Sequence, residues 1–422
     1  MNKKKLLAWG DSPTASTGFG TVSKYIITAL HASGMFEIDQ LAINYHGNFV
    51  SKEEVPWQLV PAKLADPNDP YGSKMFLRSI SERDYDYIWI LNDTFVVHQV
   101  AKDMRAILDK KKEQNKTVAK VVFYYPVDCR IIPEMSDMLK LCDIPVAYNQ
   151  FGKDETIKEL PDLADKIKII HHGTDTQIYK PFSKEIIKGL KEKYFGYDTP
   201  KYIVMNVNRN SPRKQIAKTM LAFSEFKKKV PDSILYIHAM AQDKDIDLIV
   251  AAKHLGLRPK DDLVFPPNYS PSYGYPAHVL NELYNCGDMF LTTHLGEGWG
   301  LTVTEAMAAG VPVVAPNNTS MPDILGEESQ RGFLYQCNDQ CYIDNSGYRK
   351  FATTDVIVNK MLEVYNLEWK HNLKQVVFAR KWVDAHNWGS ACSLWLTLFR
   401  ELEEQKVSAL QENTPSCVGE LL

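Results

Sequence analysis

The feature that most limits the fold of this chain is the regular alternation of short apolar segments with longer amphipathic ones. Most apolar segments have about four to eight residues, the length of a buried strand, and the segments between them have apolar residues at helical spacing. This alternation is typical of parallel sheets built from β-α-β units. In the first half of the chain it predicts strands at Leu6–Trp9, Glu37–Asn44, Tyr87–Leu91, Val121–Tyr125, Pro145–Tyr148 and Ile167–His171.

The pattern starts again after a connecting stretch from Gly173 to Pro200. With 422 residues the chain is long enough for two or three domains. We therefore predict an α/β protein of two Rossmann-like, doubly wound halves that face a central cleft, where ligands bind at the carboxyl ends of the strands. The second half has predicted strands at Tyr202–Val207, Ile234–Ala239, Leu263–Phe265, Met289–Thr293 and Val311–Ala315. Predicted amphipathic helices include Val22–His31, Ile216–Lys229 and Pro276–Cys286.

The domain boundaries follow from this division. Residues 1–180 are predicted to form the first domain and residues 181–382 the second. A last helical stretch, 383–404, carries Trp388 and Trp395 and is predicted to be a separate closing helix. Residues 405–422 are polar and are predicted to form a loose tail.

Composition excludes several classes of protein. The hydrophobic content of 45% and the charged content of 24% are ordinary for a globular protein. A net charge of −3 with a pI near 6.4 provides no overall basic field for nucleic acid. Cys337 and Cys341 are the only close pair among seven cysteines and have no partner pair at zinc spacing, which indicates reduced thiols and a cytoplasmic location. No apolar run has membrane-spanning length, and the first five residues lead directly into a strand and not into a signal-peptide core.

Two glutamates eight positions apart mark the most informative segment. A predicted strand leads into the turn that carries Glu297, and Glu305 lies about one turn into the helix that follows. The N-terminus of such a helix can face an anion, and both carboxylates can reach the same bound molecule. An ordinary strand, turn and helix with solvated glutamates is the alternative, because the helix dipole alone favours a carboxylate at Glu305.

This segment resembles the Glu-x7-Glu signature of the retaining, nucleotide-sugar-dependent glycosyltransferases of the GT-B fold, in particular family 4. The glycines, the spacing and the trailing Glu-Ala-Met-Ala-x-Gly-x-Pro-Val all agree. The resemblance implies that Glu297 contacts the donor sugar and that Glu305 binds the ribose. It also implies that the closing helix crosses back onto the first domain. The turn that approaches the sugar and diphosphate comprises Gly298, Trp299, Gly300, Leu301 and Thr302.

Two basic residues follow the first strand of the second half. Arg209 and Lys214 match the spacing of an Arg and a Lys that hold the donor diphosphate in family 4. Each charged hydrogen bond to the departing diphosphate contributes about 1.5–3 kcal/mol, and the planar guanidinium fits phosphate oxygens. Arg213 in the same loop is interpreted as a surface charge. A solvated basic turn is the alternative for the whole segment.

A glycine-rich loop follows the first strand of the chain. Gly18 and Gly20 suggest dinucleotide binding at first sight, but the pair begins about eight residues after the strand. The third glycine position is Ser23, which argues against an NAD-dependent dehydrogenase. In GT-B proteins this loop faces the donor diphosphate, so the resemblance implies that Gly18, Phe19 and Gly20 present backbone and a helix N-terminus to the phosphates. A flexible loop is the alternative.

Two other strand ends of the first half, at Leu91–Thr94 and Tyr124–Asp128, are predicted to lie at the cleft. Family 4 often has a histidine near the second, and this chain has Asp128 instead. Asp128 is a candidate for binding a sugar or acceptor hydroxyl, and capping of the following segment is the alternative. The turn at His171–Asp175 resembles the family's exit from the first domain and is interpreted as structural. His238 and His294 are interpreted as buried core histidines.

The resemblance implies transfer with retention from a UDP- or GDP-sugar, without a metal ion or other cofactor. Asp84-Tyr85-Asp86 and Asp243-Lys244-Asp245 match the Asp-x-Asp of the other glycosyltransferase fold, but such triplets are common by chance. An epimerase or phosphorylase on the same scaffold and a catalytically silent nucleotide-sugar-binding protein are the competing hypotheses. The acceptor stays open. The basic stretch 97–120 suggests either a helix that touches anionic lipid or a solvated helix, and a nucleic-acid acceptor is a further alternative.

Overall fold

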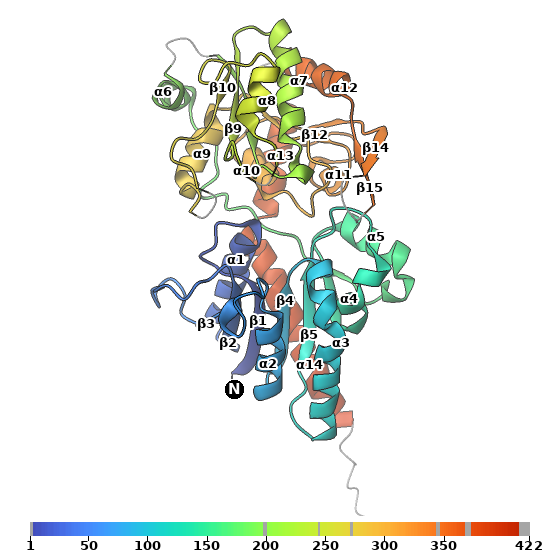
Figure 1. Cartoon of the computed structure of the whole chain (residues 1–422). Helices are drawn as coiled ribbons and strands as arrows, with labels where there is room; N and C mark the ends of the chain where they lie inside the picture. Colours follow the sequence, from blue (N-terminus) through green and yellow to red (C-terminus); the bar gives the residue numbers. More distant parts are fainter. Residues whose placement is uncertain are drawn as a thin grey trace, which may run out of the picture.

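The computed structural model describes residues 3–196, 201–243, 245–270, 273–342, 347–367 and 373–412, with side chains as far as residue 405. Figure 1 shows two layered α/β units, one above the other, joined by the segment after the first sheet and by the last helices. The two Rossmann-like halves predicted from the alternation of segments are therefore confirmed. Among the described helices, none has the length and apolar character needed to span a membrane.

The first unit is a parallel sheet of seven strands in the order β3-β2-β1-β4-β5-β6-β7. Alternate residues of its strands face two different layers of helices, because side chains in a strand point to opposite faces. Leu6, Ala8 and Trp89 pack toward α1 and α14, whereas Leu7 and Ile88 pack toward α2 and α3. The strands are β1 (Lys4–Asp11), β2 (Phe36–Ile43), β3 (Gln58–Pro61), β4 (Tyr87–Leu91), β5 (Lys120–Tyr125), β6 (Ile144–Ala147) and β7 (Lys168–Ile169). The helices are α1 (Gly18–Ala32), α2 (Ser73–Glu82), α3 (Thr94–Glu113), α4 (Asp137–Leu141) and α5 (Gln150–Glu159).

The second unit is a parallel sheet of six strands in the order β10-β9-β8-β11-β12-β13, with a separate hairpin of β14 and β15. Helices α7 and α12 cover one face, and α9, α10 and α13 cover the other. The strands are β8 (Tyr202–Val207), β9 (Ser233–His238), β10 (Leu263–Val264), β11 (Met289–Leu291), β12 (Val313–Pro316), β13 (Phe333–Tyr335), β14 (Asp339–Tyr342) and β15 (Tyr348–Phe351). The helices are α6 (Lys184–Phe195), α7 (Ile216–Lys229), α8 (Leu248–His254), α9 (Ala277–Cys286), α10 (Leu301–Ala308), α11 (Met321–Leu325) and α12 (Thr354–Tyr365).

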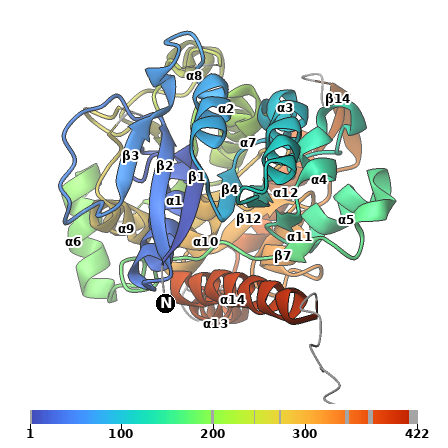
Figure 2. The same cartoon turned by 90° about the horizontal axis from the view of Figure 1, so that it is seen from below.

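Two last helices, α13 (Lys374–Ala385) and α14 (Trp388–Glu412), return the chain to the first unit. Helix α13 packs on α10 of the second unit, and α14 packs on α1 of the first. Figure 2 shows α14 lying across the face of the first sheet. At the crossing, a β-carbon added to Gly173 would lie 2.3 Å from the backbone nitrogen of Trp388. The two connections between the units therefore touch each other at this point.

The prediction of one closing helix over 383–404 is wrong in its bounds. Val383 lies within α13, which ends at Ala385, and His386 interrupts the helix before α14 begins at Trp388. Helix α14 continues to Glu412, so residues 405–412 are helical and not a loose tail, and residues 413–422 lie outside the described residues. The sequence patterns also did not predict β3, β13 and the β14–β15 hairpin, which have at most four residues each. Strands β3, β14 and β15 include exposed positions, whereas β13 is buried throughout.

Candidate functional site

The turn between β11 and α10 lies directly against the first unit. A β-carbon added to Gly296 would lie 1.9 Å from the carbonyl oxygen of Asp128, and one added to Gly298 would lie 2.9 Å from Cβ of Pro126. Asn149 Nδ2 donates a hydrogen bond of 2.8 Å to the carbonyl oxygen of Gly298. The glycines of the predicted motif therefore permit the two units to touch. Gly300 has φ of +101°, a backbone conformation that glycine adopts readily, and it starts α10.

Glu297 is 7% exposed and lies in this turn between two cations. Its Oε1 accepts a hydrogen bond from Lys214 Nζ, and its Oε2 lies 3.1 Å from Arg213 Nη1. Burial alone would raise the pKa of Glu297, but the charges of Lys214 and Arg213 outweigh burial and hold that pKa well below its usual range. Glu297 is therefore an ionised carboxylate with a fixed orientation. Burial lowers the pKa of Lys214, and the Glu297 charge opposes this shift.

Arg213 joins the two units, so its interpretation as a surface charge is wrong. Its Nε lies 3.1 Å from Asp128 Oδ2, and its Nη1 donates to the carbonyl oxygen of Gly296. Burial works against the charged guanidinium, but Glu297 and Asp128 outweigh burial and raise the pKa of Arg213. The sequence singled out the loop around Arg209 and Lys214, whereas the contact of Arg213 with the first unit depends on how the units pack.

Arg209 has a different partner in the structure. It forms a bidentate pair with Asp243, with Nε to Oδ2 at 2.7 Å and Nη2 to Oδ1 at 3.2 Å. Its side chain is 48% exposed, against 16% for Lys214. The structure thus does not bring Arg209 and Lys214 onto one carboxylate, and the predicted diphosphate clamp of these two residues stays a prediction. Lys244 of the Asp243–Asp245 triplet lies outside the described residues.

Glu305 lies in α10 with tyrosines, apart from the charged cluster of Glu297. Tyr284 Oη donates to Glu305 Oε2 at 2.9 Å, and Tyr179 also forms a hydrogen bond with this carboxyl. Burial raises the pKa of Glu305 to about 7, and the two tyrosine hydroxyls limit that rise. The two glutamates of the motif therefore differ in charge state near neutral pH. Glu297 is ionised, and Glu305 titrates.

The first-domain glycine loop lies against the start of α10. A β-carbon added to Gly18 would lie 3.7 Å from Cδ1 of Leu301, so the N-termini of α1 and α10 lie opposite each other. Thr17 caps α1 by accepting a hydrogen bond from the Gly20 amide at 2.9 Å. A β-carbon added to Gly20 would lie 2.3 Å from the carbonyl oxygen of Ala15, so this glycine is required by the fold of the loop itself.

Asp128 is held by two arginines of the second unit. Besides the Arg213 contact, Arg349 Nη1 donates to the Asp128 carbonyl oxygen at 2.9 Å and lies 3.4 Å from Oδ1. Arg349 belongs to β15, a short strand that no sequence pattern marked. Asp128 therefore sits at the interface of the two units, and its predicted role toward a sugar hydroxyl is untested.

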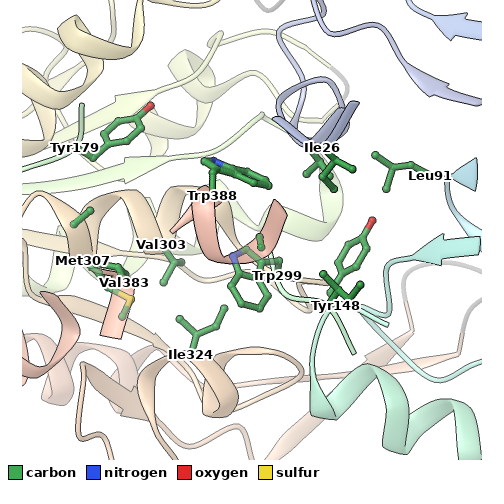
Figure 3. Packing of buried hydrophobic residues seen from close by; sticks show 14 of the residues in the cluster. Ile26, Leu91, Tyr148, Tyr179, Trp299, Val303, Met307, Ile324, Val383 and Trp388 are labelled. Carbon is green, nitrogen blue, oxygen red and sulfur yellow. The ribbon is translucent and has the colours of Figure 1, made fainter. Parts of the chain in front are cut away.

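Trp299 and the predicted structural histidines are part of the packed interior. The Trp299 ring lies 6.0 Å from Trp382 and 5.7 Å from His172 between ring centroids. Figure 3 shows it among buried side chains, with Trp388 and Tyr148 on either side. The side chain of Trp299 is 5% exposed, and its backbone carbonyl oxygen accepts a hydrogen bond from Ser320 Oγ at 3.0 Å. His238 and His294 are buried as predicted, and burial lowers their pKa values to about 4 and about 3.

No group of three His, Cys, Asp or Glu side chains suited to a metal ion occurs in the described part of the chain. Several charges of the predicted basic stretch have partners within the first unit. Lys111 is buried and binds Asp84, and Lys102 lies 3.2 Å from Asp137. Arg105 donates to the carbonyl oxygen of Leu141. Helix α3 is therefore less basic on its surface than its sequence suggests.

The second half of the chain is similar in sequence to known glycosyl transferases. A family model described as Glycosyl transferases group 1 matches residues 190–343. The alpha-monoglucosyldiacylglycerol synthase of Acholeplasma laidlawii is 27% identical over 207 residues, which are 46% of this chain and 49% of that protein. This chain thus spans about half the length of that relative.

Solved structures with low sequence identity share the fold over nearly the whole chain. A glycosyltransferase from Rickettsia africae has a TM-score of 0.69 at 16% identity and covers 95% of this chain and 99% of its own. HepE of Anabaena, solved in complex with UDP and glucose, has a TM-score of 0.66 at 15% identity and covers 94% of this chain and 100% of its own.

The fold is therefore GT-B, with two Rossmann-like units in contact with each other. Residues 190–343 match the group 1 glycosyl transferase family model, and the chain as a whole shares the fold of the solved glycosyltransferase structures.

Proposed function

We propose that this chain is a retaining glycosyltransferase that moves a sugar from a nucleoside-diphosphate sugar, UDP- or GDP-linked, to an acceptor hydroxyl. The observation that carries the proposal is the position of Glu297, buried between Lys214 and Arg213 at the contact between the units. This carboxylate can accept hydrogen bonds from sugar hydroxyls, and the cations beside it stabilise negative charge. The A. laidlawii relative is named a glucosyldiacylglycerol synthase, and the HepE structure contains UDP and glucose, both of which support such a donor.

In this proposal the donor diphosphate lies between the N-termini of α1 and α10, where Gly18 faces Leu301. Backbone N–H groups at a helix N-terminus bind phosphate, and two such termini converge here. Lys214, which is paired with Glu297 in the turn before α10, would bind a phosphate oxygen. Arg209 would leave Asp243 to reach the phosphates, and its exposed side chain permits that movement. Glu305 would accept hydrogen bonds from the ribose hydroxyls.

In the transfer step the bond between the anomeric carbon and the phosphate oxygen breaks, and the acceptor oxygen attacks from the same face. The departing phosphate oxygen takes the acceptor proton, so the configuration is retained. Lys214 and the amides at the start of α10 stabilise the charge that develops on the diphosphate. Because side-chain cations and backbone amides stabilise this negative charge, the proposed reaction needs no metal ion. We assign the acceptor side to residues 1–180 and the donor side to residues 181–382.

The test is release of nucleoside diphosphate from UDP-glucose, UDP-galactose, GDP-mannose and ADP-glucose, with and without EDTA. We expect one donor to be cleaved, with EDTA causing no loss, and a product whose anomeric configuration by NMR matches that of the donor. Isomerisation of a purified donor without acceptor would favour an epimerase. Binding by calorimetry without any cleavage would favour a silent binding protein. An inverted product would contradict the proposed mechanism.

A further inference from the structure

Asp128 binds two arginines that come from different parts of the second unit. Arg213 belongs to the loop after β8, and Arg349 belongs to β15 of the separate hairpin. The Arg213 Nε atom lies 3.1 Å from Asp128 Oδ2, and the Arg349 Nη1 atom lies 3.4 Å from Asp128 Oδ1. Within the described residues, these are the ion pairs that join residues 3–180 to residues 181–373. The charged contact between the two units therefore depends on one carboxylate.

The guanidinium group that Asp128 binds also binds Glu297. Arg213 Nη1 lies 3.1 Å from Glu297 Oε2, and Lys214 Nζ pairs with the other oxygen, Oε1. Charges of alternating sign therefore form a charge chain across the contact, which consists of Arg349, Asp128, Arg213, Glu297 and Lys214. Asp128 is the member that the first unit supplies, so the charge chain is complete when the two units are in contact.

A second connection runs from the hairpin to the backbone of Glu297. Asn318 Nδ2 donates to the carbonyl oxygen of Lys350, the residue after Arg349, at 3.2 Å. Thr319 Oγ1 donates to Asn318 Oδ1 at 3.4 Å and accepts from the Glu297 amide at 3.0 Å. Thr319 has φ of +46°, which is costly for a β-branched residue and is found where the surroundings impose it, often at functional sites. The side chain and the backbone of Glu297 are thus both connected to the strand that carries Arg349.

The contacts of Asp128 indicate what this residue does. Both of its carboxylate oxygens and its carbonyl oxygen face guanidinium groups, which favours a role in holding the arginines over direct contact with a sugar or acceptor hydroxyl. Stability alone does not account for the arrangement, because the side chains of Asp128 and Arg213 are 27% and 32% exposed and such a pair contributes little. The pair does fix the direction from which Arg213 approaches Glu297. A carboxylate with a fixed orientation is what the proposed contact with the donor sugar requires.

We propose that Asp128 and Arg349 are positioning residues that complete the charge chain when the units meet and thereby fix Glu297 in its working orientation. This inference rests on the proposed function, because it assigns the orientation of Glu297 to that reaction. Neither residue contacts the reacting groups. Their loss should therefore lower kcat and leave the KM for the donor nearly unchanged.

The kinetic experiment compares Asp128→Asn and Arg349→Gln with the control Asp339→Asn, which removes an exposed carboxylate from the same hairpin as Arg349. The substrate is the nucleotide sugar that the wild type cleaves. We expect Asp128→Asn and Arg349→Gln each to lower kcat by about 10- to 100-fold, with a donor KM within about threefold of wild type. The double variant should be no slower than the slower single variant, because both changes break the same charge chain. Arg349→Lys restores the charge and should recover part of kcat.

Hydrogen exchange followed by mass spectrometry tests the positioning without any enzymatic activity. Peptides that span residues 294–300 contain the Glu297 amide, whose hydrogen bond to Thr319 belongs to the second connection. Exchange in these peptides should be faster in Asp128→Asn and Arg349→Gln than in wild type and in Asp339→Asn, because a less ordered turn opens more often.

The outcomes separate this inference from the proposed function. The inference is overturned if exchange in the turn is unchanged, or if the kinetic losses of the two single variants are additive. It is also overturned if Asp128→Asn raises the KM for a substrate at unchanged kcat, because Asp128 would then bind that substrate directly. Faster exchange in both variants, together with a wild type that cleaves no donor, would show that the charge chain orders Glu297 and that the proposed function is wrong.

Discussion

Replacement of Gly296 by alanine tests whether the close contact between the two units is needed for activity. The added β-carbon would lie 1.9 Å from the carbonyl oxygen of Asp128, and an ordinary contact begins at 3.4 Å, so the turn and the first unit must separate by about 1.5 Å. Gly296 does not have a positive φ, so the cost is steric and not a matter of backbone strain. The same shift would pull Arg213 from the Gly296 carbonyl oxygen and move Glu297 from its cations.

A displacement of about 1 Å at reacting groups lowers rates by about 100-fold. We therefore expect Gly296→Ala to lower kcat/KM for donor cleavage by about 100-fold, which corresponds to about 2.7 kcal/mol. The overpacked contact should also lower the free energy of unfolding by about 1–3 kcal/mol. Steady-state release of nucleoside diphosphate and urea unfolding measure the two effects.

The matched control is Gly189→Ala in α6, where a β-carbon would have no atom within 4 Å. Alanine in a helix interior is favoured over glycine by about 1 kcal/mol, so this variant should be more stable and equally active. A Gly296→Ala variant with activity within about twofold of wild type would refute the reasoning, because a 100-fold effect is expected.

Three further predictions follow from the charges. Burial raises the pKa of Glu305 to about 7, so the carboxylate that we propose to bind the ribose loses charge as the pH falls. Donor affinity by calorimetry should fall about 10-fold from about pH 8 to about pH 6, and Glu305→Gln should bind the donor weakly at both pH values. Arg213→Ala leaves Asp128 and Glu297 with fewer partners and should lower kcat/KM by at least about 10-fold. Arg209→Ala, in contrast, should mainly raise the KM for the donor. If Arg209→Ala changed kcat as much as KM, the proposed role of Arg209 in binding the donor would be contradicted. Lys191 and Asp288 form a largely buried ion pair in the second unit, with 2.8 Å between Nζ and Oδ2. Lys191→Ala should therefore lower the free energy of unfolding by about 3 kcal/mol and leave kcat unchanged. A reduced kcat in the folded fraction would contradict this prediction.

The overall architecture was predictable because each sheet is built from local β-α-β units. Apolar segments such as Tyr87–Leu91 are long and buried at every position, and β4 has the predicted bounds. Strands such as β3 and β15 have exposed positions and depend on their neighbours for pairing, so no apolar run marks them. The break at His386 was missed because hydrophobic residues continue on both sides of it.

The candidate site was predictable where one segment carries it. Glu297, Glu305 and the glycines between them form a local motif with a characteristic spacing. Contacts across the cleft were not predictable, because they depend on how the units pack. Asn149 resembles an ordinary cap, since its Oδ1 accepts from the Gly152 amide, and only the structure shows its bond to the Gly298 carbonyl oxygen.

Donor cleavage by wild type and by Lys214→Met tests the central claim most directly, since methionine keeps the length of the side chain and removes its charge. Wild type should release nucleoside diphosphate from at least one of the four nucleotide sugars. Lys214→Met should release it about 100-fold more slowly. The control Lys188→Met, which replaces an exposed lysine of α6, should release it at the wild-type rate. Undiminished cleavage by Lys214→Met, or failure of the wild type to bind or cleave any of the donors, would contradict the account.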